Sequence, residues 1–334
     1  MHRLVVILIT VSLLLCACGQ ATPPAVTYPD APTAPVSTDA TEPAAPPFPL
    51  WIRPEHSPAP SEAGFEPVEP SPVEALLQTM TPEEKVGQLF LARCPDIRAV
   101  EDIQTYHLGG YILFGRDFQG QTPQSMAATI AQYQAAAAIP MLIAVDEEGG
   151  TVTRVSSYKA FRSGRFPSPR NLYNQGGLSL LLQTEAEKCQ LLRSLGIQVN
   201  MAPVCDITTD SRAFMYSRSL GLSPADTATA FAAMDPKFPV SLSLPAHRYL
   251  RQKMGFDGVI VTDDLVMGAI TKQYGAEEAA VLAVLAGNDL LCSSEYAIQF
   301  RAVLVAVQSG RIPQAILDAA VCRVLQWKHT LGLL

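Results

Sequence analysis

The chain lacks the sequence features of several common protein classes. It has no run of basic residues and its formal net charge is −7, so nucleic acid is not an expected partner. The five cysteines beyond residue 72 show no CxxC or other metal-binding spacing, so no metal site is predicted. The leading apolar run, Leu4 to Leu15, has 12 residues, whereas a helix that crosses a membrane needs about 20. The sequence therefore predicts neither a nucleic-acid-binding protein nor a membrane-spanning one.

The first residues have the pattern of a secretory signal. A short cationic start, Met1 to Arg3, precedes the apolar run, and the small residues Cys16 and Ala17 come directly before Cys18. This ending resembles a bacterial lipobox, which implies cleavage before Cys18 and lipidation of its thiol. An ordinary cleaved signal with an incidental cysteine is the alternative. We expect an exported protein, lipid-anchored through Cys18 to the outer face of the bacterial cell membrane.

A proline-rich segment separates this signal from the rest of the chain. Fifteen of the 27 prolines fall between Pro23 and Pro72, mixed mainly with Ala, Thr, Ser and Glu. Proline at this density removes backbone donors and favours an extended chain. We therefore expect a signal peptide over residues 1–17, a disordered tether over residues 18–72 and one folded domain over residues 73–334.

The folded part alternates short apolar runs with helical patterns. Apolar runs occupy residues 111–114, 141–145, 199–203, 258–261 and 289–292, with helical segments such as 124–138 and 180–195 among them. This alternation indicates a parallel sheet buried on both faces, and about 260 residues suit a single (β/α) barrel. A doubly wound sheet is the alternative, but no GxGxxG motif follows the first strand. Polar residues follow the strands directly, where a barrel has its catalytic mouth: Asp146 to Glu148, Asp206, Thr262 to Asp264, and Ser293 with Ser294.

Six motifs carry a resemblance to a known family. In chain order they are EKVGQLF (84–90), GGYILFGRDF (109–118), VDEEGGTVTR (145–154), NMAPVCDI (200–207), YSRSLG (216–221) and GFDGVIVTDDLVMGAI (255–270). Together they resemble the N-terminal barrel domain of family 3 glycoside hydrolases, in its β-N-acetylhexosaminidase branch. The resemblance covers nearly everything from residue 72 onward, and it implies an α/β fold of the TIM-type (β/α) barrel class.

The resemblance also implies roles for particular residues. It makes Asp263 the nucleophile, which suits a retaining glycosidase because that mechanism needs an ionised carboxylate at the anomeric carbon. Helix capping is the alternative for this acid, and Asp264 beside it is expected to support the loop. Sugar-binding residues are expected in the loop after the third strand and in the next turn: Asp146, Glu148, Arg154 and Arg218. A simple ion pair with a nearby acid is the alternative for the arginines, and Thr151 stands where the family commonly has arginine.

One part of the family pattern is absent from the sequence. The family has a lysine–histidine pair after its fifth strand and a KHFPGHG-like loop whose histidine is the general acid/base. This chain has neither, and Arg218 lies only 45 positions before Asp263. We therefore expect an incomplete barrel without the fifth and sixth strands, and no general acid/base. His107, His247 and His329 are predicted to be surface residues, which leaves Glu147 and Glu148 as the nearest alternative proton donors.

Two functions follow from these patterns. The first is a retaining exo-β-N-acetylhexosaminidase type of glycoside hydrolase, acting on N-acetylglucosamine-containing or other amino-sugar glycans and impaired by the missing loop. The second is a surface lipoprotein that binds such a carbohydrate without cleaving it. Neither needs a metal or organic cofactor, because two protein groups suffice for glycoside hydrolysis. A solute receptor is disfavoured, because the sequence shows no pair of similar α/β lobes.

The lipobox interpretation predicts the location of a variant. Because the lipid would be attached to Cys18, Cys18→Ala should move the protein from the membrane fraction to the medium or periplasm. Fractionation followed by immunoblotting measures this directly. Unchanged membrane association of the variant would contradict lipidation at this residue.

Overall fold

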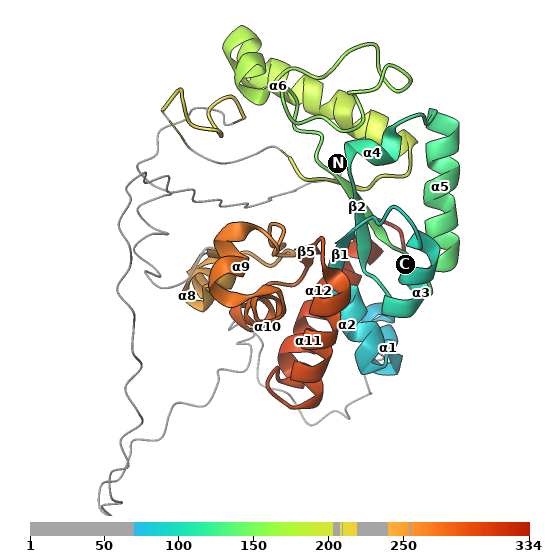
Figure 1. Ribbon diagram of the computed structural model, residues 1–334, viewed down its shortest axis with the longest axis vertical. Coiled ribbons are helices and arrows are strands. Elements are labelled where there is room, and N and C mark those ends of the chain that lie inside the picture. The colour runs from blue at the N-terminus through green and yellow to red at the C-terminus, as the bar shows by residue number, and fades with distance from the viewer. Residues whose placement is uncertain (1–69, 203–207, 209, 219–239, 254) are drawn as a thin grey trace, which may run out of the picture. The chain divides into compact units, whose positions relative to one another are not determined.

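The computed structural model describes residues 70–202, 208, 210–218, 240–253 and 255–334. Its centre is a parallel sheet with the strand order β4-β3-β2-β1-β5. Figure 1 shows β2, β1 and β5 of this sheet with helices around them. The strands are β1 (Phe90–Arg93), β2 (Gly110–Leu113), β3 (Leu142–Val145), β4 (Val199–Asn200) and β5 (Leu291–Ser293). A parallel bridge between Val261 and Leu290 adds one more extended segment beside β5.

The helices lie around this sheet and connect its strands. They are α1 (Pro72–Thr79), α2 (Pro82–Gln88), α3 (Ala99–Tyr106), α4 (Gly115–Phe118), α5 (Pro123–Ala136), α6 (Pro169–Ser194), η1 (Val240–Leu242), α8 (Leu244–Arg248), η2 (Tyr249–Lys253), α9 (Gly268–Tyr274), α10 (Ala276–Ala286), α11 (Tyr296–Gln308) and α12 (Gln314–Thr330). Successive contacts run from α5 to α3, α2, α11 and α10, as expected for an outer helical layer. No helix among the described residues is long and apolar enough to cross a membrane.

Local sequence explains where α2 begins. Thr81 accepts a hydrogen bond from the Glu84 N–H at 3.2 Å, and the Glu84 carboxylate accepts one from the Thr81 N–H at 2.8 Å. Pro82, the first helical residue, has no N–H to leave unpaired. This reciprocal capping and the proline together set the start of the helix.

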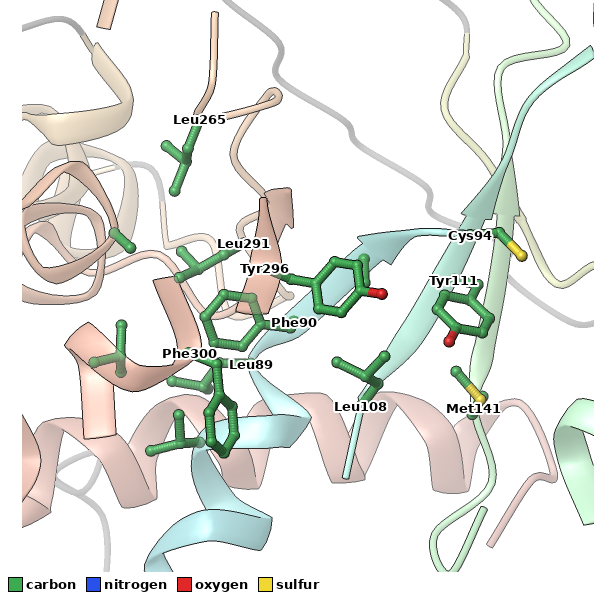
Figure 2. Packing of buried hydrophobic residues seen from close by; sticks show 14 of the residues in the cluster. Leu89, Phe90, Cys94, Leu108, Tyr111, Met141, Leu265, Leu291, Tyr296 and Phe300 are labelled. Atoms are coloured by element: carbon green, nitrogen blue, oxygen red, sulfur yellow. The ribbon is translucent and has the colours of Figure 1, made fainter. Parts of the chain in front are cut away.

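Side chains alternate between two buried clusters on the two faces of the sheet. Phe90, Tyr111 and Leu291 belong to the larger cluster, which includes residues of the surrounding helices such as Phe300 (Figure 2). Leu91, whose side chain has the opposite direction, belongs to the second cluster. This inner-face cluster also contains Ile112, Leu142, Ala144, Val199, Met201, Leu290, Cys292 and Val324, with Val261, Trp327, Leu331 and Leu333 packed against it.

The sheet forms an incomplete barrel. Six consecutive strand positions are present, from β4 through β5 to the extended segment at Val261. Among the described residues no strand joins β4 to that segment, whereas a complete barrel of this class closes with eight strands. This agrees with the predicted absence of the fifth and sixth strands. The predicted signal, most of the predicted tether, Asp206 and the interval 219–239 lie outside the described residues.

A lysine is fully buried between α12 and α2. The Lys328 ammonium donates to the Gln88 side-chain oxygen at 2.5 Å, and the Gln88 amide donates to the His107 carbonyl at 2.9 Å. Burial lowers the pKa of Lys328 to about 7, because a charged ammonium loses its hydration there. The folded protein therefore holds this side chain neutral at mildly alkaline pH.

The buried lysine predicts how stability depends on pH. Between pH about 7 and about 10 the unfolded chain binds a proton at Lys328 that the folded chain has released, so the free energy of unfolding rises with pH. The slope contributed is at most about 1.4 kcal/mol per pH unit. Lys328→Met should lose this slope, and its stability advantage over the wild type should be largest below pH 7. Urea unfolding at several pH values measures the free energy of unfolding of both proteins, and the exposed Lys272→Met is the control. Parallel pH profiles of the wild type and Lys328→Met would contradict the prediction.

Candidate active site

The loop after β3 is built around one buried carboxylate. Glu147 is fully buried and accepts hydrogen bonds from the N–H groups of Arg154 (2.9 Å), Val155 (2.7 Å) and Ser156 (3.4 Å). The Ser156 hydroxyl donates to its other oxygen. With both oxygens occupied and no exposed surface, Glu147 is not available to protonate a leaving group. It instead fixes the loop that carries Asp146 and Arg154.

Two glycines allow the same loop to turn tightly. Gly149 and Gly150 have φ angles of 103° and 67°, in the region that side chains disfavour. A Cβ atom on Gly149 would lie 2.1 Å from the Pro167 carbonyl oxygen, and one on Gly150 would lie 2.7 Å from the Ser168 Cβ. The glycine pair of the VDEEGG motif is therefore required by close packing against residues 167–168.

Asp146 and Arg154 form the first ion pair of the candidate site. The Arg154 guanidinium donates to the Asp146 carboxylate at 3.0 Å, and both side chains are about a quarter exposed. Burial raises the pKa of Asp146, Arg154 opposes this increase, and the charges of Glu148 and Asp263 add to it. The charges of Glu148 and Asp263 therefore both act on Asp146.

Glu148 and Arg218 form the second ion pair. The Arg218 Nε and Nη2 atoms donate to the two Glu148 oxygens at 2.8 Å and 2.6 Å, in a bidentate fork. The Glu148 side chain is only 4% exposed and that of Arg218 17%. The ion-pair alternative for this arginine is thus present in the structure. The third guanidinium nitrogen, Nη1, lies 3.0 Å from the Met215 sulfur. Sugar binding by Glu148 and Arg218 stays a prediction.

Helix α6 holds both members of this second pair. At its start, Arg170 donates to the Tyr216 carbonyl at 2.7 Å and stacks on the Tyr216 ring at 3.9 Å, two residues before Arg218. Further along, the fully buried Lys188 donates to the Glu148 carbonyl at 2.7 Å. Neither contact could be predicted from the sequence, because both depend on the path of the chain around α6.

The predicted nucleophile lies beyond the strand segment at Val261. Asp263 is exposed, and its charge raises the pKa of Asp146 as well as that of the buried Cys292. Asp264 accepts hydrogen bonds from the Ser294 hydroxyl at 2.5 Å and from the Ser294 N–H at 3.2 Å. As predicted, Asp264 supports the loop. The structure therefore brings Asp146, Glu148, Arg154, Arg218 and Asp263 together at the carboxyl end of the sheet.

A buried acid behind Asp263 fixes its segment of chain. Asp289, fully buried at the start of the β5 region, accepts the Ile260 N–H at 2.8 Å. It also pairs with Arg251 at 2.5 Å and with Arg323 at 2.7 Å. The strand segment that leads to Asp263 is thus attached to the barrel by a carboxylate with two cationic partners.

No histidine of the described residues lies at this mouth. His247 was predicted to be a surface residue, and this was wrong: it is buried, with Nδ1 2.8 Å from the Ser243 carbonyl and its ring next to Gly287. His107 precedes β2, at the opposite end of the sheet, and is half-buried. His329 is exposed near the end of α12. None of the three is placed to donate a proton at Asp263.

A separate pocket lies at the other end of the sheet. It has a volume of about 180 Å³ and is lined by α2, α3 and the segment after α5, with Gln88, Gln104 and His107 as its polar residues besides Glu84. The candidate catalytic carboxylates do not line it. The mouth at the carboxyl ends of the strands, and not this pocket, is therefore the candidate active site.

Comparisons with known proteins agree with the motifs. The sequence pattern described as the glycosyl hydrolase family 3 N terminal domain matches residues 81–235 and 227–327. "Beta-hexosaminidase LpqI" of Mycobacterium tuberculosis is 25% identical over 345 residues, covering 78% of this chain and 85% of that protein. Because 345 exceeds the 334 residues of this chain, the alignment includes positions that have no counterpart here.

Comparison with solved structures agrees with the sequence match. A family 3 β-N-acetylglucosaminidase from Paenibacillus sp. is 28% identical with a TM-score of 0.65, covering 76% of this chain. The chain spans 63% of that protein. The structure of LpqI from M. tuberculosis has a TM-score of 0.64 at 22% identity, covering 75% of this chain and 94% of that one. The latter similarity establishes the fold, which is that of the predicted barrel.

The role of Glu147 as the anchor of the loop can be tested by an isosteric change. Glu147→Gln removes the charge and turns one acceptor oxygen into an NH₂ group that faces backbone donors. We expect a loss of at least about 2 kcal/mol of unfolding free energy, because buried donors lose their partner. Thermal and urea unfolding measure it, with the half-exposed Glu187→Gln as the matched control. Equal stability of the two variants would show that Glu147 is not the anchor.

Proposed function

Because the chain belongs to family 3 of the glycosyl hydrolases, we propose that it is a retaining exo-β-N-acetylhexosaminidase type of enzyme with impaired activity. Its substrates are amino-sugar glycans that carry terminal N-acetylglucosamine. The similarity to proteins named β-hexosaminidase and β-N-acetylglucosaminidase supports this substrate class. The observation that carries the proposal is the convergence of two arginine–carboxylate pairs and Asp263 at one mouth.

The two ion pairs supply the groups that a sugar ring requires. Asp146 offers carboxylate oxygens to hydroxyl donors, and Arg154 offers guanidinium donors to hydroxyl or acetamido oxygens. The Glu148–Arg218 fork stands beside them, linked through the loop that Glu147 holds. Pre-formed pairs of this kind lose little conformational freedom when a ligand binds, so they favour recognition of one orientation of the ring.

Asp263 can perform the first chemical step of a retaining mechanism. Its carboxylate oxygen attacks the anomeric carbon, the bond from that carbon to the leaving oxygen breaks, and the leaving oxygen takes the electron pair. A water molecule then attacks the anomeric carbon of the glycosyl-enzyme and loses its proton to the solvent, while the bond to Asp263 breaks and restores the carboxylate, giving a sugar of retained configuration. The exposed position of Asp263 suits such an attack, since nothing of the described protein buries it.

The impairment follows from the missing proton donor. A sugar alkoxide is a poor leaving group, and general acid catalysis contributes roughly 10²–10⁴-fold to its departure. The sequence holds no lysine–histidine motif between Arg218 and Asp263. Residues 227–235 match the family pattern twice, which supports a loss of intervening sequence at that point.

The absence of a proton donor from the sequence motifs also favours a second candidate function. The chain can act as a surface lipoprotein that binds glycan through Asp146, Arg154, Glu148 and Arg218 without cleaving it. Attachment to the membrane through Cys18 belongs to both proposals and is supported by the lipobox alone. The two functions differ in whether a glycosyl group is ever transferred to Asp263.

An activated substrate distinguishes the impaired enzyme from the glycan-binding protein. A dinitrophenyl leaving group departs without a proton, so dinitrophenyl N-acetylglucosaminide should react slowly while unactivated disaccharides are cleaved negligibly. Intact-mass spectrometry should show one glycosyl group added to the protein, and Asp263→Asn should abolish the addition. Asp257→Asn, an exposed acid shortly before the same segment, is the matched control and should keep it.

Two results would contradict the impaired-enzyme proposal. Efficient hydrolysis of an unactivated disaccharide would mean that another residue supplies the proton. No adduct and no turnover, in a protein with a cooperative unfolding transition, would favour the binding function.

A further inference from the structure

The pocket at the end of the sheet opposite the mouth has the size of a small ligand. Its volume is about 180 Å³, and an apolar cavity of about 150 Å³ is large enough to bind benzene. Helix α3 contacts both α2 and α5, and the three helices lie together in Figure 1. The apolar part of the pocket is formed by Ile103, Leu108, Ile139 and the three alanines 136–138. A ring or a short alkyl group therefore fits into it.

Hydrogen bonds within the protein hold two sides of this pocket in place. On α2, the Gln88 amide donates to the His107 carbonyl at 2.9 Å. After α5, the Gln134 side chain donates to the Met141 carbonyl at 2.9 Å and accepts from the Met141 N–H at 2.8 Å, which fixes the segment between α5 and β3. The pocket is thus formed before a ligand arrives, so binding costs little ordering of the protein.

The carboxyl ends of two helices give the pocket a negative potential. Helix α3 ends at Tyr106 and α5 at Ala136, and residues at both ends line the pocket. The last carbonyls of a helix have no partners within it, and the helix dipole places up to about half a negative charge there. Neither helix has a lysine or an arginine in its last turn to offset this charge. The pocket therefore favours a cation.

A carboxylate adds a full negative charge to the same pocket. Glu84 is one of the lining residues, and its Oε2 atom accepts from the Thr81 N–H at 2.8 Å, which holds the carboxylate in position. The described lining residues include no lysine and no arginine, and the imidazole of His107 can accept a hydrogen bond as well as donate one. Acceptors and negative charge on one side, with an apolar surface on the other, match an ammonium group attached to a small apolar body.

We propose that this pocket binds a small organic amine, with its ammonium group at Glu84 and its apolar body against Ile103 and Ile139. An ammonium group carries three donors, for the carboxylate and for carbonyls at the helix ends. A bare metal ion fits less well, because the described residues contain no group of three side chains that could hold one. The amine site is separate from the mouth, since none of the candidate sugar-binding residues lines it.

The test compares a charged and a neutral ligand of the same shape on the whole protein. Ligand-observed NMR titration measures the affinities of benzylamine and of benzyl alcohol at mildly alkaline pH, at which Lys328 behind Gln88 is neutral. Benzylamine should bind about 10-fold more tightly, because a charge-assisted hydrogen bond is added to the same apolar contacts. This preference should decrease as the salt concentration is raised.

Variants assign the preference to Glu84. Glu84→Gln should remove most of it and leave the affinity for benzyl alcohol within about 2-fold, because glutamine keeps the size of the side chain and can still cap the helix. Glu83→Gln, the same change at a neighbouring acid that does not line the pocket, should keep the full preference. Ala137→Leu fills the cavity and should weaken both ligands at least about 10-fold. It also serves if Glu84→Gln fails to fold.

A further variant separates this pocket from the acidic residues of the mouth. Asp263→Asn should leave the affinity for benzylamine unchanged. Loss of the preference in Asp263→Asn, with its survival in Glu84→Gln, would assign the ammonium group to the mouth and overturn the proposal. Equal affinity of the wild type for the two ligands, or binding of neither, would also overturn it. So would unchanged affinities in Ala137→Leu, because the ligands would then bind elsewhere.

Discussion

The candidate site depends on the burial of one carboxylate among backbone donors. Glu147 accepts three N–H groups and a hydroxyl from residues 154–156, so a loop that leaves β3 is forced to return against it. Without that return, Arg154 would not face Asp146, and Glu148 would not be aimed at Arg218. A buried negative charge is tolerable only with this number of donors, which is why the loop has little freedom to rearrange.

The incomplete barrel still supports the loop after β3. Six consecutive parallel strand positions keep the two faces of the sheet distinct, with helices on one side and the inner-face cluster on the other. Trp327, Leu331 and Leu333 pack against the inner face and contribute apolar area to it. The carboxyl ends of β1, β2 and β3 therefore stay in register, and with them Arg93, Phe114 and Asp146.

The sequence could predict what is locally encoded. The apolar runs and the short interval between Arg218 and Asp263 predicted the strands and the incomplete barrel. It could not distinguish the three acids of residues 146–148, because only the fold decides that Glu147 is enclosed while Asp146 reaches the mouth. His247 was misjudged for a similar reason: its helix looked like a surface helix, yet it packs against α10.

Side-chain hydrogen bonds help to fix the register of the short strand β4 against β3. The Gln198 side-chain oxygen accepts the Ile143 N–H at 2.9 Å, and the Asn200 oxygen accepts the Glu147 N–H at 2.9 Å, so both amides stand in for strand carbonyls. The Asn200 NH₂ group completes the exchange by donating to the Glu147 carbonyl at 3.3 Å. A slip of one residue would turn both amides to the opposite face and break these bonds. A strand of two residues can thus keep its register through side-chain hydrogen bonds that replace backbone ones. Because one of these bonds is to Glu147, the same contacts also fix the position of the loop after β3.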